Sequence, residues 1–251
     1  MIRERDGISW IEPQWPVPYQ VRAASTLRMG GTSTAPFDSL NLALHVGDAR
    51  EAVLHNRRRV ARVLNLPGEP CWLQQVHGIN VVAAGSLDEP PVADASFTTT
   101  PGQVCAVMTA DCLPVLLCNR DGTCVAAAHA GWRGLSAGVL EATIRAMNVQ
   151  AAALVAWLGP AIGRDAYEVG DEVRDVFIAR NSANDQCFTR NKNHRWLADM
   201  NALARNELRR LGVDAVFNDA ACTANDTRFF SYRRDGRTGR MASMIWLQPG
   251  H

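Results

Sequence analysis

Apolar residues are concentrated near the middle of the chain, in runs that have the length of β-strands. Three of these runs cover residues 104–108, 112–118 and 123–129, and the last two are separated by a turn that ends at Gly122. Continuous apolar runs bounded by turn residues are typical of strands that are covered on both faces. We therefore expect these three segments to form the buried centre of a sheet.

Shorter apolar runs beside glycine or proline predict more strands. They cover residues 70–77, 80–84, 153–158 and 241–247. These strands alternate with segments of helical periodicity, and such a mixture is typical of layered folds. The pattern predicts an α/β, or α+β, fold in which a mixed sheet and helices form a layered sandwich.

Helical spacing of apolar residues predicts four helices. Three cover residues 51–64, 168–179 and 197–211, and the fourth follows Ser136. Asp48 is a candidate N-cap for the first helix and Ser136 for the fourth, because short polar side chains can accept hydrogen bonds from the first N–H groups of a helix. The helices are therefore expected to begin close to these residues.

The composition is that of an ordinary globular protein, with 47% hydrophobic and 20% charged residues. A chain of 251 residues can bury a full core as one unit, and no repeat or linker divides it, so a single domain over 1–251 is expected. The formal net charge is only +1, which leaves no overall field to attract nucleic acid or an anionic membrane surface. We therefore expect no nucleic-acid partner and no membrane partner.

The N-terminus and the cysteines both favour a soluble, cytoplasmic protein. The first residues carry charges with no apolar stretch behind them, and nowhere do about eighteen apolar residues follow one another. The seven cysteines are an odd number without CxxC spacing, and several lie inside apolar runs, as reduced thiols do. A reducing compartment is expected, with the chain as a monomer or a weak homodimer.

Three reactive side chains, His77, Cys112 and His129, lie where an apolar run meets a turn marked by glycine or proline. Such positions are where a rigid scaffold presents groups to a cleft. Two imidazoles and one thiolate suit a catalytic zinc site, in which three protein ligands leave one position open and the metal lowers the pKa of bound water toward about 7. The residue types predict a metal site here, although their spacing is not a metal-binding signature by itself.

The same residues also permit a reaction without a metal. Cys112 would then be the nucleophile and His129 or His77 its base, with Asp111 or Asp94 orienting the imidazole. Asp111 also suits a purely local role as a turn residue. The residues alone therefore leave a metal site and a thiol nucleophile open.

Two arginines are candidate anion-binding residues. Arg133 lies where the chain enters a predicted helix, and an arginine beside a helix N-terminus suits a phosphate group. Arg57, on the first predicted helix, is the other candidate. The segment 230–240 is basic with interleaved aromatic residues, which permits nucleic-acid binding, but a turn packed by Phe230 and Tyr232 is the favoured interpretation.

A series of short motifs spans nearly the whole chain. In order they are Gly30-Gly-Thr-Ser33, Ser39-Leu-Asn-Leu42, His45-Val-Gly-Asp48, Asn56-Arg57, Gln74-Gln-Val-His-Gly78, Ala93-Asp-Ala95, Thr109-Ala-Asp-Cys-Leu-Pro-Val115, His129-Ala-Gly-Trp-Arg-Gly134, Leu158-Gly-Pro-Ala-Ile-Gly163, Tyr167-Glu-Val-Gly170, Cys222-Thr223 and Phe230-Ser-Tyr-Arg-Arg-Asp235. Together they resemble the YfiH-type family, once labelled multicopper polyphenol oxidases or laccase-domain proteins and later described as purine nucleoside phosphorylases. One departure is Thr32, where the family often has an aliphatic residue.

The resemblance implies a compact α/β sandwich similar to the catalytic domain of cytotoxic necrotizing factor. It also implies a zinc site at His77, Cys112 and His129, with copper as the less favoured metal. Family members are described as cleaving adenosine, inosine, guanosine and methylthioadenosine with phosphate, and as deaminating adenosine. Purine nucleosides and phosphate are therefore the expected substrates, with Arg57 and Arg133 expected to bind phosphate and Asp111 to carry a proton.

Other functions stay open beside this one. Some relatives are linked to peptidoglycan editing, the removal of wrongly built UDP-muramoyl-serine, and hydrolysis of that amide is the main alternative. A non-catalytic protein with structural zinc is another, although structural zinc sites usually have four protein ligands. A true multicopper oxidase is disfavoured, because a coupled copper cluster needs many imidazoles and the chain has six histidines without a His-x-His pair.

Overall fold

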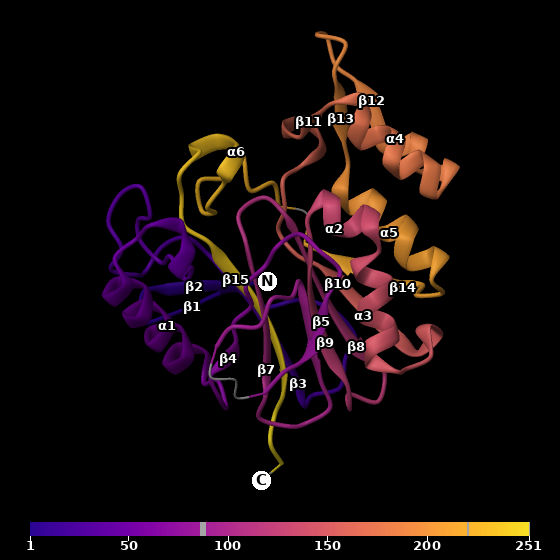
Figure 1. Cartoon of the computed structure of the whole chain (residues 1–251). Helices are drawn as coiled ribbons and strands as arrows, with labels where there is room; N and C mark the ends of the chain where they lie inside the picture. The colour runs from indigo at the N-terminus through magenta and orange to yellow at the C-terminus, as the bar shows by residue number, and fades with distance from the viewer. Residues whose placement is uncertain (86–88, 220, 251) are drawn as a thin grey trace.

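Two six-stranded sheets lie face to face in the computed structural model, which describes residues 1–85, 89–219 and 221–250 (Figure 1). In spatial order the strands of the first sheet are β1 (Ile2–Arg5), β2 (Ile8–Ile11), β3 (Val21–Thr26), β15 (Met241–Leu247), β7 (Val104–Thr109) and β4 (Pro70–Cys71). Those of the second sheet are β14 (Ala215–Asn218), β10 (Leu154–Leu158), β8 (Leu113–Asn119), β9 (Val125–Ala130), β6 (Ala95–Thr98) and β5 (Val81–Ala83). Both sheets are mixed, because each contains parallel and antiparallel neighbours.

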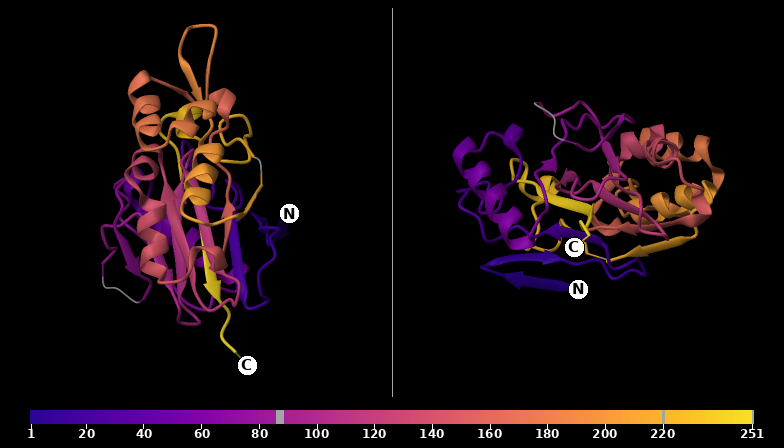
Figure 2. Two further views of the ribbon diagram at one scale, coloured as in Figure 1. Left: turned by 90° about the vertical axis from the view of Figure 1, so that its right-hand side faces the viewer. Right: turned by 90° about the horizontal axis from the view of Figure 1, so that it is seen from below.

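Helices cover the outer faces of the two sheets. The helices are α1 (Arg50–Leu64), α2 (Trp132–Ala137), α3 (Val139–Met147), α4 (Asp171–Arg180), α5 (Met200–Arg210) and the short α6 (Tyr232–Asp235). Helix α1 packs on the first sheet, and α3, α4 and α5 pack on the second. In Figure 1 and the right view of Figure 2 the purple helix α1 therefore lies on one side of the molecule and the orange helices α4 and α5 on the other.

The alternation of side chains along the strands builds the layers. On β7, Val107 faces the second sheet, whereas its neighbour Ala106 packs with the α1 layer. On β8, Leu116 faces the first sheet and Val115 packs with the helices on the far side. Because both faces of these strands are covered, their side chains are buried along the whole length, as the continuous apolar runs predicted.

A small third sheet stands beside the helices of the second layer. It consists of β11 (Glu168–Val169), β13 (Trp196–Ala198) and β12 (Phe188–Arg190), and all its pairs are antiparallel. The connection between β12 and β13 projects from the body of the molecule (Figures 1 and 2). Across the residues that the structure describes, none of the helices combines the length and apolar character needed to cross a membrane.

The predicted α/β class is confirmed, and so are most of the central elements. Helix α1 and strands β8, β9 and β10 lie within two residues of the predicted bounds, and β15 covers 241–247 as predicted. The similarity to cytotoxic necrotizing factor stays a prediction. The apolar pattern did not predict β1, β2, β3, β6, β12 and β14. In β1, β3 and β6 the apolar residues are few or interrupted by polar ones, and β14 is only four residues long.

The prediction of a strand over 70–77 was wrong beyond Cys71. The backbone N–H groups of Val76, His77 and Gly78 donate to the carboxylate of Asp94 instead of to a neighbouring strand. His77 also has a φ of 60°, which is incompatible with an extended strand. The end of this segment is therefore a loop whose N–H groups are held by the Asp94 carboxylate.

Two predicted helices begin later than expected, because short strands occupy their first residues. Glu168 and Val169 pair with β13, so α4 begins at Asp171. Trp196 to Ala198 form β13 itself, and the side chain of Asp199 then caps α5 by accepting from the N–H of Ala202.

Both predicted N-caps were wrong. Asp48 accepts from the side chains of Ser33 and Asn41, and the N-cap of α1 is Ala49. Ser136 lies inside α2, and α3 begins after Gly138. The helices start near the expected positions, but Asp48 is used in tertiary contacts and the Ser136 hydroxyl donates to the carbonyl of Arg133 in its own helix.

Candidate active site

Three side chains from different segments converge at one end of the sheets. His77 comes from the loop after β4, Cys112 from the turn between β7 and β8, and His129 from β9, one residue before its end. Their ligand atoms all lie within 4.8 Å of one another, and 3.8 Å separates the Cys112 Sγ from the His77 Nε2. The structure thus brings together the three residues predicted as metal ligands.

A buried carboxylate links two of these residues. Asp94 is fully shielded from solvent and accepts a 2.8 Å hydrogen bond from the Nδ1 of His129. Its oxygens also accept from the backbone N–H groups of Val76, His77 and Gly78, at 3.2, 2.9 and 2.6 Å. Asp94 therefore orients the His129 ring with its Nε2 toward Cys112, and it holds the loop that carries His77.

The protonation of Cys112 and His129 is strongly coupled. Burial would raise the pKa of Cys112, but the charge and hydrogen bond of His129, together with His77, lower it to about 6. Burial would lower the pKa of His129, but the Cys112 thiolate and the bond to Asp94 raise it to about 9. At neutral pH the two side chains form a thiolate and imidazolium pair, and binding of a metal would displace the imidazolium proton.

The backbone is in unfavourable conformations at two site residues. His77 and Asp111 have φ values of 60° and 90°, in a region that side-chain-bearing residues rarely adopt. Such strain persists where surrounding contacts hold it, as the bonds from Asp94 do at His77. Strained backbone concentrated around a cluster of reactive groups is a feature of functional sites.

Asp111 is held by two hydrogen bonds in the turn before Cys112. Its Oδ1 accepts from the hydroxyl of Thr223 and its Oδ2 from the backbone N–H of Arg233, both at 2.6 Å. The side chain is buried but borders the cavity next to the cluster. It was predicted as a proton carrier, and its place is consistent with contact to a bound molecule.

The cluster opens into a cavity of about 290 Å³. Its lining residues come from both sheets and from the C-terminal segment: His45, Gln75, His77, Met108, Thr109, Ala110, Asp111, Cys112, His129, Ile162, Tyr167, Tyr232, Arg233 and Arg240. A concave, mostly apolar site with a few polar groups is typical of small-molecule binding.

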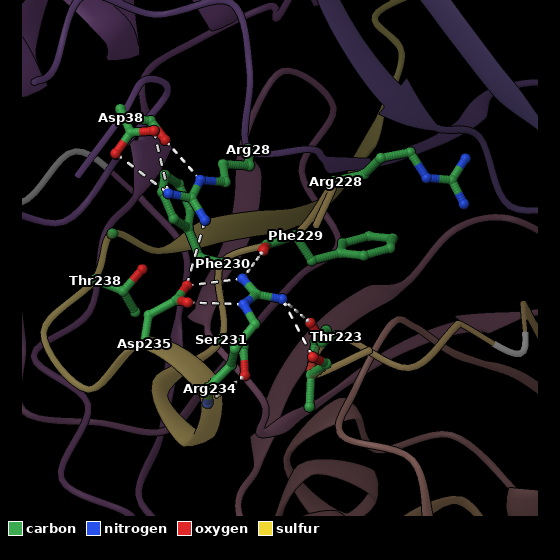
Figure 3. Close-up of polar contacts among 12 residues, drawn as sticks. Arg28, Asp38, Thr223, Arg228, Phe229, Phe230, Ser231, Arg234, Asp235 and Thr238 are labelled. Carbon is green, nitrogen blue, oxygen red and sulfur yellow. Dashed lines mark hydrogen bonds and ion pairs between the residues drawn. The ribbon is translucent and has the colours of Figure 1, made fainter. Parts of the chain in front are cut away.

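A network of charged residues holds the C-terminal wall of this cavity in place (Figure 3). Asp235, at the end of α6, accepts from Arg234 at 2.7 Å and from Arg28 at 3.3 Å. Arg28 also binds Asp38, and Arg234 donates to the backbone carbonyls of Thr223 and Phe229. Loops far apart in the sequence are therefore joined around α6, which carries Tyr232 and Arg233.

The structure places the two predicted arginines outside the cavity lining. Arg57 donates to the carbonyl of Leu42 at 2.9 Å and its guanidinium lies 3.9 Å from the centre of the Trp72 ring. Arg133, on α2, lies over its neighbour Trp132. A direct role of either residue in phosphate binding stays a prediction.

The C-terminal residues that line the cavity are not among the site residues predicted from the sequence. The expected turn is packed by Phe230, which is buried, but Tyr232 is 62% exposed and stands at the cavity. Arg233 and Arg240 also reach the cavity. The signal was the interleaving of aromatic and basic residues in 230–240, which was assigned to packing.

Comparison with known proteins gives consistent matches along the chain. A family model described as multi-copper polyphenol oxidoreductase laccase matches residues 22–248. The chain is 54% identical to a purine nucleoside phosphorylase of Pseudomonas aeruginosa over 96% of this chain and 99% of that protein. It is 53% identical to the purine nucleoside phosphorylase YfiH of Escherichia coli, over 94% of this chain and 98% of the relative.

Solved structures show the same fold. A Neisseria meningitidis protein, NMB0706, superposes with a TM-score of 0.92 at 49% identity, covering 96% of this chain and 99% of that one. YlmD of Geobacillus stearothermophilus superposes with a TM-score of 0.90 at 29% identity, covering 98% of both chains. The arrangement of the sheets and helices is thus shared with experimentally determined relatives.

Proposed function

The chain belongs to the multi-copper polyphenol oxidoreductase laccase family, and from its relatives and its site we propose that it is a zinc-dependent purine nucleoside phosphorylase. Its substrates would be adenosine, inosine, guanosine and methylthioadenosine, and it would also deaminate adenosine. The observation that carries the proposal is the convergence of His77, Cys112 and His129 beside a cavity of about 290 Å³. A cytoplasmic location and a monomeric or weakly dimeric state complete the proposal.

The donor set fits a single zinc ion. His129 is fixed by Asp94 with its Nε2 toward Cys112, Cys112 is readily ionised, and His77 completes three ligands. Within the described part of the chain no fourth residue joins this group, which favours a catalytic site with an open position over a structural one. When bound, zinc supplies Lewis acidity and an activated water at neutral pH. Copper is the alternative metal.

The other cavity residues suit a nucleoside with phosphate. A cavity of about 290 Å³ lies near the lower end for small-molecule sites and is too small for a polymer. Tyr167 and Tyr232 line the cavity and are the aromatic residues proposed to contact a purine. In phosphorolysis a phosphate oxygen forms a bond to C1′ of the ribose while the bond from C1′ to the purine nitrogen breaks. Asp111 is proposed to carry the proton that the departing base takes up.

In this proposal Arg57 and Arg133 attract phosphate electrostatically, although neither residue lines the cavity. Their positive charges would stabilise an anion in the cavity without direct contact. In adenosine deamination no phosphate takes part: water adds at C6 of the purine and ammonia leaves.

A second candidate is a hydrolase that cleaves an amide, such as that of UDP-muramoyl-serine. The observation in its favour is that Cys112, His129 and Asp94 form a line of nucleophile, base and orienting carboxylate. This arrangement needs no metal, although zinc could also support amide cleavage at the same site. Metal content and product analysis together separate it from the nucleoside phosphorylase.

The proposal is tested on purified wild-type protein beside Cys112→Ser. Both are analysed for bound metal and incubated with adenosine and phosphate, and adenine, inosine and ribose 1-phosphate are measured. We expect about one zinc per wild-type chain and loss of the metal in the variant. Turnover by the variant should fall more than about 100-fold, because loss of a ligand costs more than loss of a residue that only hydrogen-bonds to a ligand. Cys222→Ser, which changes the other partly exposed cysteine, is the matched control.

The possible results separate the candidates. Wild-type protein that holds zinc but leaves nucleosides unchanged contradicts the proposal and favours the amide hydrolase. Activity that depends on Cys112 and survives complete removal of metal by a chelator assigns a thiol nucleophile. A protein that binds zinc but acts on neither nucleosides nor the amide of UDP-muramoyl-serine would be assigned the non-catalytic function.

A further inference from the structure

The cavity beside the cluster has a basic side that the proposed metal ligands do not explain. His45 and Arg240 both line it, and they come from segments nearly 200 residues apart in the sequence. His45 lies in a short 3-10 turn, Leu44–Val46, and Arg240 directly precedes β15. The two segments are joined, because the N–H of Arg240 donates to the side chain of Asn41 at 3.0 Å.

The guanidinium of Arg240 is positioned but not neutralised. Its Nη1 donates to the carbonyls of Thr238 and Gly239 at 2.9 and 3.0 Å. Among the described residues it forms no ion pair, whereas Arg180 and Arg234 each bind a carboxylate. Burial lowers the pKa of Arg240, and the negative charges of Cys112 and Asp111 offset only part of this effect, so the guanidinium would gain from an anion in direct contact.

Neighbouring groups add to the positive potential. The Arg57 guanidinium stands behind the turn of His45, bound to the carbonyl of Leu42, and burial lowers its pKa to about 10. Burial, followed by the charges of Arg240 and Arg57, lowers the pKa of His45, so its ring is a neutral hydrogen-bonding group at pH 7. A negative ligand in this part of the cavity would meet two guanidinium charges and an imidazole.

The acidic groups nearby are already engaged. Asp111 also borders the cavity, but both its oxygens accept short hydrogen bonds from Thr223 and Arg233. Glu69 acts on Arg57, but its carboxylate accepts a 2.6 Å bond from the Trp72 indole. Neither carboxylate forms an ion pair with Arg240, so the basic side of the cavity is available to an external anion.

We propose that Arg240 and His45, with Arg57 behind them, form the subsite that binds inorganic phosphate. The inference rests on the proposed phosphorylase activity. It assigns the direct contacts with phosphate to residues that line the cavity, and not to Arg57 and Arg133 as the sequence predicted. Among the described residues the Arg240 guanidinium donates only through Nη1, so its Nε and Nη2 are proposed to donate to phosphate oxygens. His45 is proposed to form one hydrogen bond with the phosphate. Phosphate held there lies in the same cavity as Cys112, His77 and His129.

The test measures phosphate binding directly, without a nucleoside. Inorganic phosphate is titrated into metal-loaded wild type, Arg240→Gln and His45→Gln by calorimetry, and the titrations are repeated on metal-free protein. We expect the Kd to rise about 10- to 100-fold for Arg240→Gln, as for loss of a charge-assisted hydrogen bond, and about 3- to 10-fold for His45→Gln. Arg58→Gln, an exposed arginine next to Arg57, is the matched control and should bind like wild type. Arg240→Lys, which keeps the charge, should bind with an intermediate Kd, and unchanged thermal unfolding verifies that the variants fold.

Each result decides between the inference and the underlying function. Equal phosphate binding by wild type and Arg240→Gln, or binding that is abolished by metal removal and insensitive to Arg240, overturns the subsite. So does a wild type that cleaves nucleosides while Arg240→Gln keeps the wild-type KM for phosphate. Phosphate binding that depends on Arg240 without any release of base from nucleosides supports the subsite and contradicts the phosphorylase proposal.

Discussion

At the scale of single residues, Asp94 contributes more to the site than its sequence context indicates. It lies between two alanines, and the sequence predicts it only as one of two possible partners for an imidazole. In the structure it accepts four hydrogen bonds and lies out of reach of solvent. Hydrogen bonds from the backbone and His129 overcome the effect of burial and lower the pKa of Asp94, so it is a carboxylate at neutral pH.

Replacement of Asp94 by asparagine should therefore weaken metal binding while preserving side-chain size. The amide nitrogen cannot accept a hydrogen bond, so either His129 or the loop at 76–78 loses its partner. We expect metal affinity to fall about 10- to 100-fold, as for other partners of ligating histidines. Competition with a chromophoric chelator measures this, with the exposed Asp214→Asn as control. Equal affinity of Asp94→Asn and wild type would show that Asp94 does not position the ligands.

At the scale of elements, the start of α2 is shaped to fit the cluster. Gly131 is the N-cap of α2 and has a φ of −63°, which any residue can adopt. A methyl group at this position would nevertheless lie 2.8 Å from the Cδ2 of His77 and 3.0 Å from the Sγ of Cys112. The glycine is needed for the close approach of the helix start to the site, and not for its own backbone conformation.

Gly131→Ala should consequently damage the site more than the fold. Displacement of His77 or Cys112 is expected to lower turnover, by about 100-fold if it reaches about 1 Å. The thermal unfolding temperature of the metal-free protein should change little, since alanine fits this backbone conformation. Gly85→Ala is the matched control, because its nearest neighbour, the amide of Gln103, lies 3.7 Å from the added methyl group. A variant with wild-type turnover, or one that fails to fold, would refute this account of Gly131.

At the scale of the whole molecule, an ion-pair network joins the helices that cover the second sheet. Glu207 on α5 is only 5% exposed and accepts from Arg180 on α4 at 2.6 Å and from Arg210 at 2.9 Å. Both arginines also bind Glu141 on α3. Burial would raise the pKa of Glu207, but the hydrogen bonds and charges of Arg210 and Arg180 leave it lowered.

This shift predicts a dependence of stability on pH. A lowered pKa in the folded state means that the stabilisation is complete above the ordinary glutamate pKa of 4.5 and is lost as the pH falls toward the lower, folded value. Glu207→Gln should reduce the free energy of unfolding by about 1–3 kcal/mol at pH 7, and this deficit should shrink below about pH 4.5. Urea unfolding at pH 7, 5 and 3.5 measures it, with the exposed Glu172→Gln as control. A deficit that stays constant down to the lowest pH would mean that the network does not act through the charge of Glu207.

Local pattern alone was enough to determine the class of the fold, its central strands β7 to β10 and helix α1. Each of these depends on side-chain type and spacing within one segment, such as the continuous apolar run that becomes β8. The ligands were selected from residue chemistry at the edges of such runs and from the resemblance to the YfiH-type family.

Tertiary structure decided the partners of these residues. The end of the segment at 70–77 is a loop because Asp94, from elsewhere in the chain, takes its N–H groups, and no local pattern contains that contact. Arg57 and Arg240 have the same side chain, and only the packing of segments nearly 200 residues apart places one behind the cavity and the other in its lining. Hydrophobic patterning is a property of one segment, whereas hydrogen bonds and electric fields depend on distances between segments that only the folded chain defines.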